Sequence, residues 1–137
     1  MEIGGVNILS IGAAGAAGFV FAAVYYTVFG GPWQRALGMT EDQMKAIIGP
    51  ACFITAAIAQ LTMAAVLAGT LFHFGPDKLT IENALLSAAL LWLGFVITTL
   101  AVNHRFQGAK WSLTIINGGN WLGVLLVQGL VLSVMGI

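Results

Sequence analysis

The chain has 137 residues, of which 59% are hydrophobic and only 7% are charged. A water-soluble domain usually carries about 25% charged residues, so this chain has too few to cover a surface in water. Its five basic and five acidic residues balance, which excludes the clustered positive excess that nucleic-acid binding requires. The composition therefore predicts one integral membrane domain over residues 1–137, with no nucleic acid as a partner.

Four long runs of the sequence carry no charge, and each exceeds the roughly 20 residues that cross a bilayer as a helix. The runs lack the alternation of a barrel strand, and a helix satisfies its own backbone in lipid. We therefore expect an all-α integral membrane protein, an antiparallel up-down bundle of four transmembrane helices. The helices are predicted near residues 5–29, 48–73, 81–103 and 111–135.

The first helix is predicted to end at Gly30-Gly31-Pro32, before the longest loop of the chain. Within that loop, Thr40 is followed three residues later by Gln43, with two acidic residues between them. This pattern is a capping box. It predicts a short interfacial helix near residues 41–47, ahead of the second span.

Basic residues are distributed unevenly between the predicted loops. Arg35 and Lys45 follow the first helix, Arg105 and Lys110 follow the third, and only Lys78 lies between the second and third. Positive residues are enriched in loops that face the cytoplasm. We therefore expect loops 30–47 and 104–110 in the cytoplasm, both termini outside, and a multi-pass location in the bacterial cell (inner) membrane.

The first predicted helix contains the small residues Gly12, Gly15 and Gly18 among alanines. Small residues at this spacing let two helix backbones approach closely in a membrane. The pattern has two interpretations, close packing within the bundle and a homo-oligomer interface, and both can hold together.

Polar side chains within the spans gather toward the predicted cytoplasmic half. An amide that faces lipid is costly, so these residues should point inward and pair. One interpretation is a polar pocket or a path for a small solute. The favoured one is interhelical hydrogen bonding that fixes the packing. The candidate residues are Tyr25, Tyr26, Gln60, Asn103, Asn117, Asn120 and Gln128.

Charged and metal-binding side chains are absent from the middle of every predicted span, which disfavours an ion-coupled pump. His73 and His104 fall at opposite membrane faces, too far apart to hold a haem together. His104, Arg105 and Lys110 are a candidate site for a lipid headgroup. We expect no catalytic, cofactor-binding or metal-ligating residues, no cofactor and no enzymatic activity.

Two stretches of the sequence resemble a widespread family of small bacterial membrane proteins with four helices and no known function. The first is Tyr25-Tyr26, Phe29-Gly30 and Trp33, with Leu37-Gly38-Met39-Thr40. The second is Gly108-Ala109-Lys110-Trp111, with Ile116-Asn117-Gly118-Gly119. The resemblance implies the four-helix fold and the membrane location. Where family members carry Tyr-His this chain has Asn120-Trp121, so no role for that histidine is implied here.

Two functions are compatible with these features. The first is a structural or interaction protein, either homo-oligomeric or an accessory subunit of a larger membrane complex. It is favoured by the small-residue faces. The alternative is an uncoupled channel or carrier for a small neutral solute along the polar side chains. In either case the expected partners are membrane lipids, with self-association or a larger membrane complex.

Overall fold

The computed structural model describes residues 2–137. Four of its helical segments are long and apolar enough to cross a membrane, so the predicted all-α membrane protein with four spans is confirmed. The third span is one continuous segment in which a π-helical turn, η2, joins two α-helices. The spans are α1 (Ile8–Val28), α4 (Pro50–His73), α5 (Ile81–Leu91) with η2 (Trp92–Val96) and α6 (Ile97–Phe106), and α7 (Trp111–Met135).

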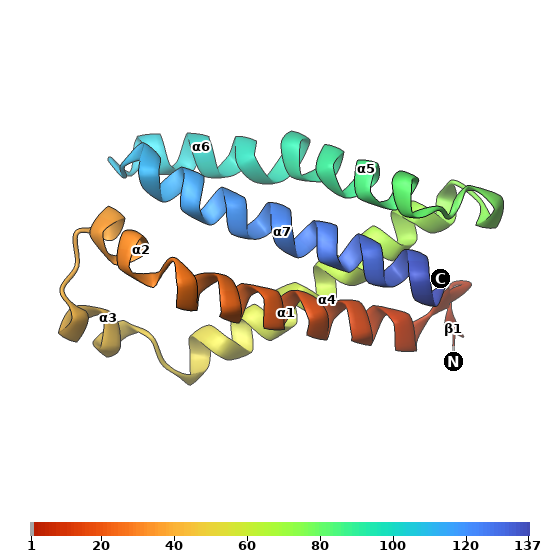
Figure 1. Cartoon of the computed structure of the whole chain (residues 1–137), viewed down its shortest axis with the longest axis horizontal. Helices are drawn as coiled ribbons and strands as arrows, with labels where there is room; N and C mark the ends of the chain where they lie inside the picture. The colour runs from red at the N-terminus through yellow and green to blue at the C-terminus, as the bar shows by residue number, and fades with distance from the viewer. Residues whose placement is uncertain (1) are drawn as a thin grey trace.

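Three of the spans lie side by side, with α7 between α1 and α5–α6, and α4 crosses them diagonally (Figure 1). The helix α4 packs mainly on α1 and meets α5 near the turn that joins the two. The chain direction reverses from each span to the next (Figure 1). Both termini therefore lie at one end of the molecule. The α6–α7 turn lies at the opposite end, which we call the turn end.

The N-terminus differs from the prediction, which began the first helix at residue 5. Gly4 and Gly5 have positive φ angles of 60° and 83°, which a right-handed helix cannot include. They form the turn of a small hairpin between β1 (Glu2–Ile3) and β2 (Val6–Asn7). The helix α1 begins only at Ile8, where the Asn7 side chain accepts a hydrogen bond from the Leu9 amide at 3.0 Å.

The segment after α1 contains more helix than the sequence indicated. The chain bends at Phe29 and continues as α2 (Gly30–Leu37). Pro32 is compatible with this helix because it falls in the first turn, where its missing N–H costs no hydrogen bond. The capping box at Thr40 forms, and α3 (Glu41–Ile47) follows it. Gly49 then precedes Pro50, the first residue of α4.

The turns beside the third span are short. A 3-10 turn, η1 (Pro76–Lys78), leads into α5, and α6 runs to Phe106, three residues beyond the predicted end at 103. Gly108 has a φ of 71° and reverses the chain into α7. The buried core runs between the spans and combines small residues with leucines: Ala14, Ala64, Ala68, Ala84, Ala88, Leu67, Leu71, Leu125 and Leu132.

Candidate polar core

The most deeply buried polar contact joins the middle of α4 to the C-terminal third of α7. Gln128 donates from Nε2 to Oε1 of Gln60 at 2.9 Å and to the Gln60 carbonyl oxygen at 3.1 Å. Both side chains are almost fully buried. Gly18 of α1 packs directly against the pair: a Cβ there would overlap Gln60 Oε1 and lie 2.8 Å from Gln128 Nε2. Three helices thus meet at this point, and a glycine is what allows them to.

A second group of hydrogen bonds joins α1 to the first half of α7. The Tyr26 hydroxyl donates to Oδ1 of Asn117 at 2.8 Å, and the Tyr25 hydroxyl donates to the carbonyl oxygen of Ile116 at 2.7 Å. Gly119 leaves room for the tyrosine, because a Cβ there would lie 2.8 Å from the Tyr25 hydroxyl oxygen. The side chains of α1 therefore fasten this part of α7 from one side.

Trp92 fastens α7 from the opposite side, and the sequence analysis did not single it out. Its Nε1 donates to the carbonyl oxygen of Gly118 at 2.8 Å. In η2 the Ile97 amide bonds to the Trp92 carbonyl, five residues back, and Ile97 also packs against Gly118. An indole within an apolar span needs an acceptor for its N–H. That requirement is the signal by which the sequence could have indicated this contact.

The remaining candidates of the predicted pocket are placed differently. Asn120 is buried, and its Oδ1 meets no hydrogen-bond donor among residues 2–137; the same holds for Oε1 of Gln128. Asn103 does not join the others, because its side chain is exposed at the turn end of α6. We call the following seven residues the polar core: Tyr25, Tyr26, Gln60, Trp92, Asn117, Asn120 and Gln128.

The three candidates for lipid headgroup binding lie at the α6–α7 turn and face different ways. His104 is buried, with Nδ1 2.8 Å from Oγ1 of Thr114. Arg105 donates from Nη2 to the same Thr114 oxygen at 2.9 Å and stacks 3.6 Å above the Trp111 ring. Lys110 alone is exposed. Two of the three side chains therefore brace the turn from inside.

The three glycines of α1 also have different surroundings. Gly15 packs on α4, where a Cβ would lie 2.7 Å from Cδ2 of Leu61, and Gly18 packs on the two glutamines. Gly12 has open space beside it, and together with Gly15 it lines an outer hollow of about 340 Å³ between α1 and α4. Gly15 and Gly18 thus serve helix packing within the chain, whereas Gly12 leaves a surface open.

The seven side chains of the polar core are neutral, and all of them except Asn120 hydrogen-bond from one helix to another. Such bonds hold spans together in lipid, each with a modest contribution. The fold and these contacts define a small multi-pass membrane protein with α7 at its centre. The chain belongs to the family DUF1761, proteins of unknown function, whose model matches residues 9–133. Comparison with curated proteins gives no match, and comparison with solved structures gives none either.

Proposed function

We propose that this protein is a structural or interaction protein of the membrane, which acts by associating with itself or with a larger membrane complex. The proposal is carried by one observation: the polar side chains best placed to line a solute path are instead bonded to one another. Tyr26 pairs with Asn117 and Gln128 pairs with Gln60. Side chains that are paired in this way hold helices together. A structural or interaction role needs no enzymatic activity.

The outer surface supports the same role. The third span is the least buried of the four: only 6% of the residues in its most apolar stretch are buried. Large side chains such as Leu86, Leu90 and Leu93 are more than half exposed along it. Exposed apolar surface of this kind is available to lipid and to other membrane helices.

The test is extraction of the tagged protein in native lipid, followed by measurement of mass and composition. The proposal expects more than one copy in each particle, or a stoichiometric partner. A single copy with lipid alone would contradict it. The double substitution Asn117→Leu, Asn120→Leu separates the two roles of the amides. Structural amides predict loss of folded protein, whereas a solute path predicts a folded protein without flux.

A second candidate function, uncoupled passage of a small neutral solute, draws on a different observation. Asn120 Oδ1 and Gln128 Oε1 are both buried and accept no hydrogen bond from the part of the chain that the structure describes. Buried oxygens of this kind are where internal water binds. Purified protein in vesicles would then admit neutral solutes of water to glycerol size faster than empty vesicles. Equal rates in the two preparations would exclude this role.

We propose the orientation from the basic residues as well. The turn end carries Arg105 and Lys110, and Arg35 and Lys45 lie in the segment between α1 and α4, so these parts are assigned to the cytoplasm of a bacterial cell. Both termini then face outward across the inner membrane. A C-terminal reporter that is active only in the cytoplasm should be inactive, and an active reporter would reverse the assignment.

A further inference from the structure

We infer that the turn between α6 and α7 binds a phosphate group through Arg105 and the first turn of α7. Two sources offer this chemistry, the headgroup of a phospholipid and free phosphate at the membrane surface. The third span ends at Phe106 and the fourth begins at Trp111, so the turn between them lies at the depth of the lipid headgroups. The inference is independent of the proposed self-association, because a single copy contains every residue of the site.

Arg105 is held in one orientation, and part of its hydrogen-bonding capacity stays unused. Its Nη2 donates to the carbonyl oxygen of Ala109 at 3.0 Å and to Oγ1 of Thr114 at 2.9 Å. Its Cζ lies 3.6 Å from the centre of the Trp111 ring. Its Nη1 is buried and meets no acceptor among residues 2–137, and a buried ionised donor without an acceptor is costly. The two N–H groups of Nη1 therefore favour a ligand that brings an acceptor.

The positive charge of Arg105 also has no anionic partner within the described chain. The ion pair found there joins Lys45 to Glu41 on α3, whereas both acceptors of Arg105 are neutral oxygens. A guanidinium forms its strongest hydrogen bonds with phosphate and carboxylate oxygens. Phosphate is the anion that the headgroup layer supplies at this depth. Because Arg105 is partly exposed, a ligand in that layer can approach its side chain.

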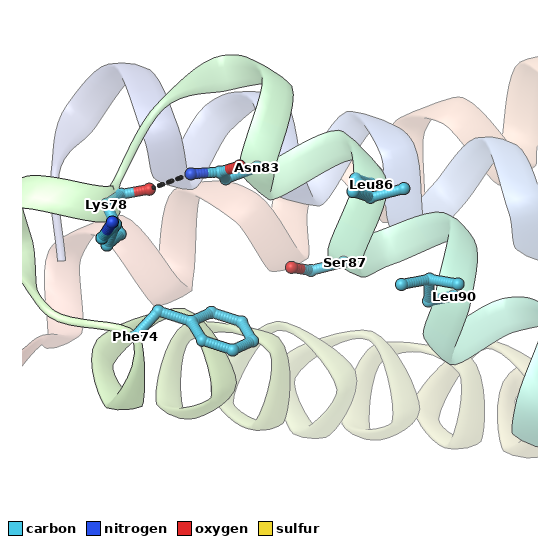
Figure 2. Close-up of a pocket in the computed structure, with 6 residues that line it drawn as sticks. All are labelled: Phe74, Lys78, Asn83, Leu86, Ser87 and Leu90. Atoms are coloured by element: carbon cyan, nitrogen blue, oxygen red, sulfur yellow. Dashed lines mark hydrogen bonds between the residues drawn. The ribbon is translucent and has the colours of Figure 1, made fainter.

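The first turn of α7 supplies further donors beside the guanidinium. Its N-cap residue, Lys110, is exposed and makes no capping hydrogen bond, and the amides of Trp111 and Ser112 have no acceptor among residues 2–137. At the opposite end of the molecule, the start of α5 is capped from within the chain. Thr80 Oγ1 accepts from the Asn83 amide at 3.1 Å, and Asn83 Nδ2 donates to a carbonyl oxygen of η1 at 2.8 Å (Figure 2). Free N–H groups at a helix N-terminus attract anions, so a phosphate fits the start of α7 rather than that of α5.

Thr114 positions the guanidinium for this role. Its hydroxyl oxygen accepts from Arg105 Nη2 and also lies 2.8 Å from Nδ1 of His104. Thr114 and His104 are both buried, so neither side chain can turn away to water. These contacts fix Nη2 and leave Nη1 as the edge of the guanidinium that is still able to donate. Thr114 is therefore a positioning residue, which acts through Arg105 rather than on the phosphate itself.

Ligand binding to the purified, delipidated protein tests the inference. Native mass spectrometry counts the bound molecules of phosphatidylglycerol, and of diacylglycerol, which has the same tails without the phosphate. We expect one tightly bound phosphatidylglycerol for each chain and little diacylglycerol. Displacement by inorganic phosphate would identify free phosphate as the ligand, and resistance to it would identify the lipid headgroup. Equal binding of phosphatidylglycerol and diacylglycerol would overturn the inference.

Two arginines near the same membrane face separate a built site from general attraction to anionic lipid. Arg105→Gln removes the guanidinium and should weaken phosphatidylglycerol binding about tenfold or more, because a charge-assisted hydrogen bond is lost. Arg35→Gln removes the same charge from an exposed position on α2 and should leave the affinity unchanged. Equal losses in the two variants would show that net charge alone attracts the lipid, and would overturn the inference.

Two further positions keep the test decisive if Arg105→Gln fails to fold. Thr114→Val keeps the shape but removes the oxygen that holds Arg105, and should weaken binding several-fold, whereas Thr114→Ser keeps the oxygen and should bind like the native chain. Lys110→Gln changes an exposed side chain, so the fold should persist while the affinity falls several-fold. Native affinity in both Thr114→Val and Lys110→Gln would overturn the inference.

Discussion

The central span α7 and its neighbour α5–α6 lie in the same layer, yet they are buried to very different extents. Of the residues in the most apolar stretch of each span, 39% are buried in α7 and 6% in α5–α6, although α5–α6 is the more apolar of the two. Lipid tails are as apolar as leucine, so hydrophobicity does not draw a helix inward in a membrane. Small and amide-bearing residues, in which α7 is rich, mark the inner helix instead.

Polar side chains on the two spans also differ in where their hydrogen bonds lead. Asn117 and Gln128 of α7 bond to α1 and α4. Thr98 and Thr99 of α6 donate to carbonyl oxygens of their own helix, at Gly94 and Phe95. A polar residue inside the protein therefore connects helices, and one that faces lipid is satisfied locally. Four substitutions can break or sharpen this contrast.

The largest effect is expected where three helices meet on α7. In Gly18→Ala the added Cβ would overlap Gln60 Oε1 and approach Gln128 Nε2 to 2.8 Å, and both side chains are buried with little room to move. Overpacking of this kind costs about 1–3 kcal/mol. The measurement is the unfolding free energy in mixed micelles, with Gly12→Ala as the control, because a Cβ at Gly12 meets open space. Equal unfolding free energies for the two variants would show that α1 is not closely packed against the glutamine pair.

The second effect concerns the glutamine pair itself. Gln128→Leu leaves Gln60 Oε1 without its donor in a buried site, and we expect a loss of about 1–2 kcal/mol. The double variant Gln60→Leu, Gln128→Leu should lose less than the sum of the two single variants, because no unpaired amide remains. Strict additivity in this double-mutant cycle would mean that the two side chains do not interact.

The third effect tests the side of α7 that faces the third span. Trp92→Phe keeps an aromatic ring but removes the Nε1 bond to the Gly118 carbonyl oxygen, with an expected cost of about 0.5–1.5 kcal/mol. Leu93→Phe is the control on the same turn, since Leu93 is 56% exposed to lipid. A Trp92→Phe protein as stable as the control would leave α7 held from the α1 side alone.

Much of the fold followed from the sequence, for reasons that the spans make plain. Uncharged runs of sufficient length must become helices in lipid, and the capping box at Thr40 depends only on local spacing. The hairpin at Gly4-Gly5 was missed because an apolar run does not reveal positive φ angles. The helix α2 was missed because Gly30-Gly31-Pro32 was interpreted only as a stop signal.

Individual contacts of the polar core were harder to foresee. Buried amides were expected to pair, but which ones pair depends on how α4 crosses α1 and α7, and that crossing is set by packing along whole helices. The hydrogen bond from Trp92 to Gly118 also depends on the π-helical turn η2. This turn brings the side chains of both Trp92 and Ile97 against Gly118. Asn103 lies in the last turn of α6, which runs three residues further than predicted, and an exposed amide there can hydrogen-bond to water or headgroups.

The smallest effect is expected for a hydroxyl that faces lipid. Thr62 is exposed on α4 and donates to the Ile58 carbonyl oxygen of its own helix at 2.8 Å. Thr62→Val keeps the shape and removes a bond that adds little to helix stability, so the unfolding free energy should change by at most about 0.5 kcal/mol. If the loss instead reached that of Gln128→Leu, the hydroxyl would have a partner outside this chain, and the distinction between inner and lipid-facing polar residues would fail on α4.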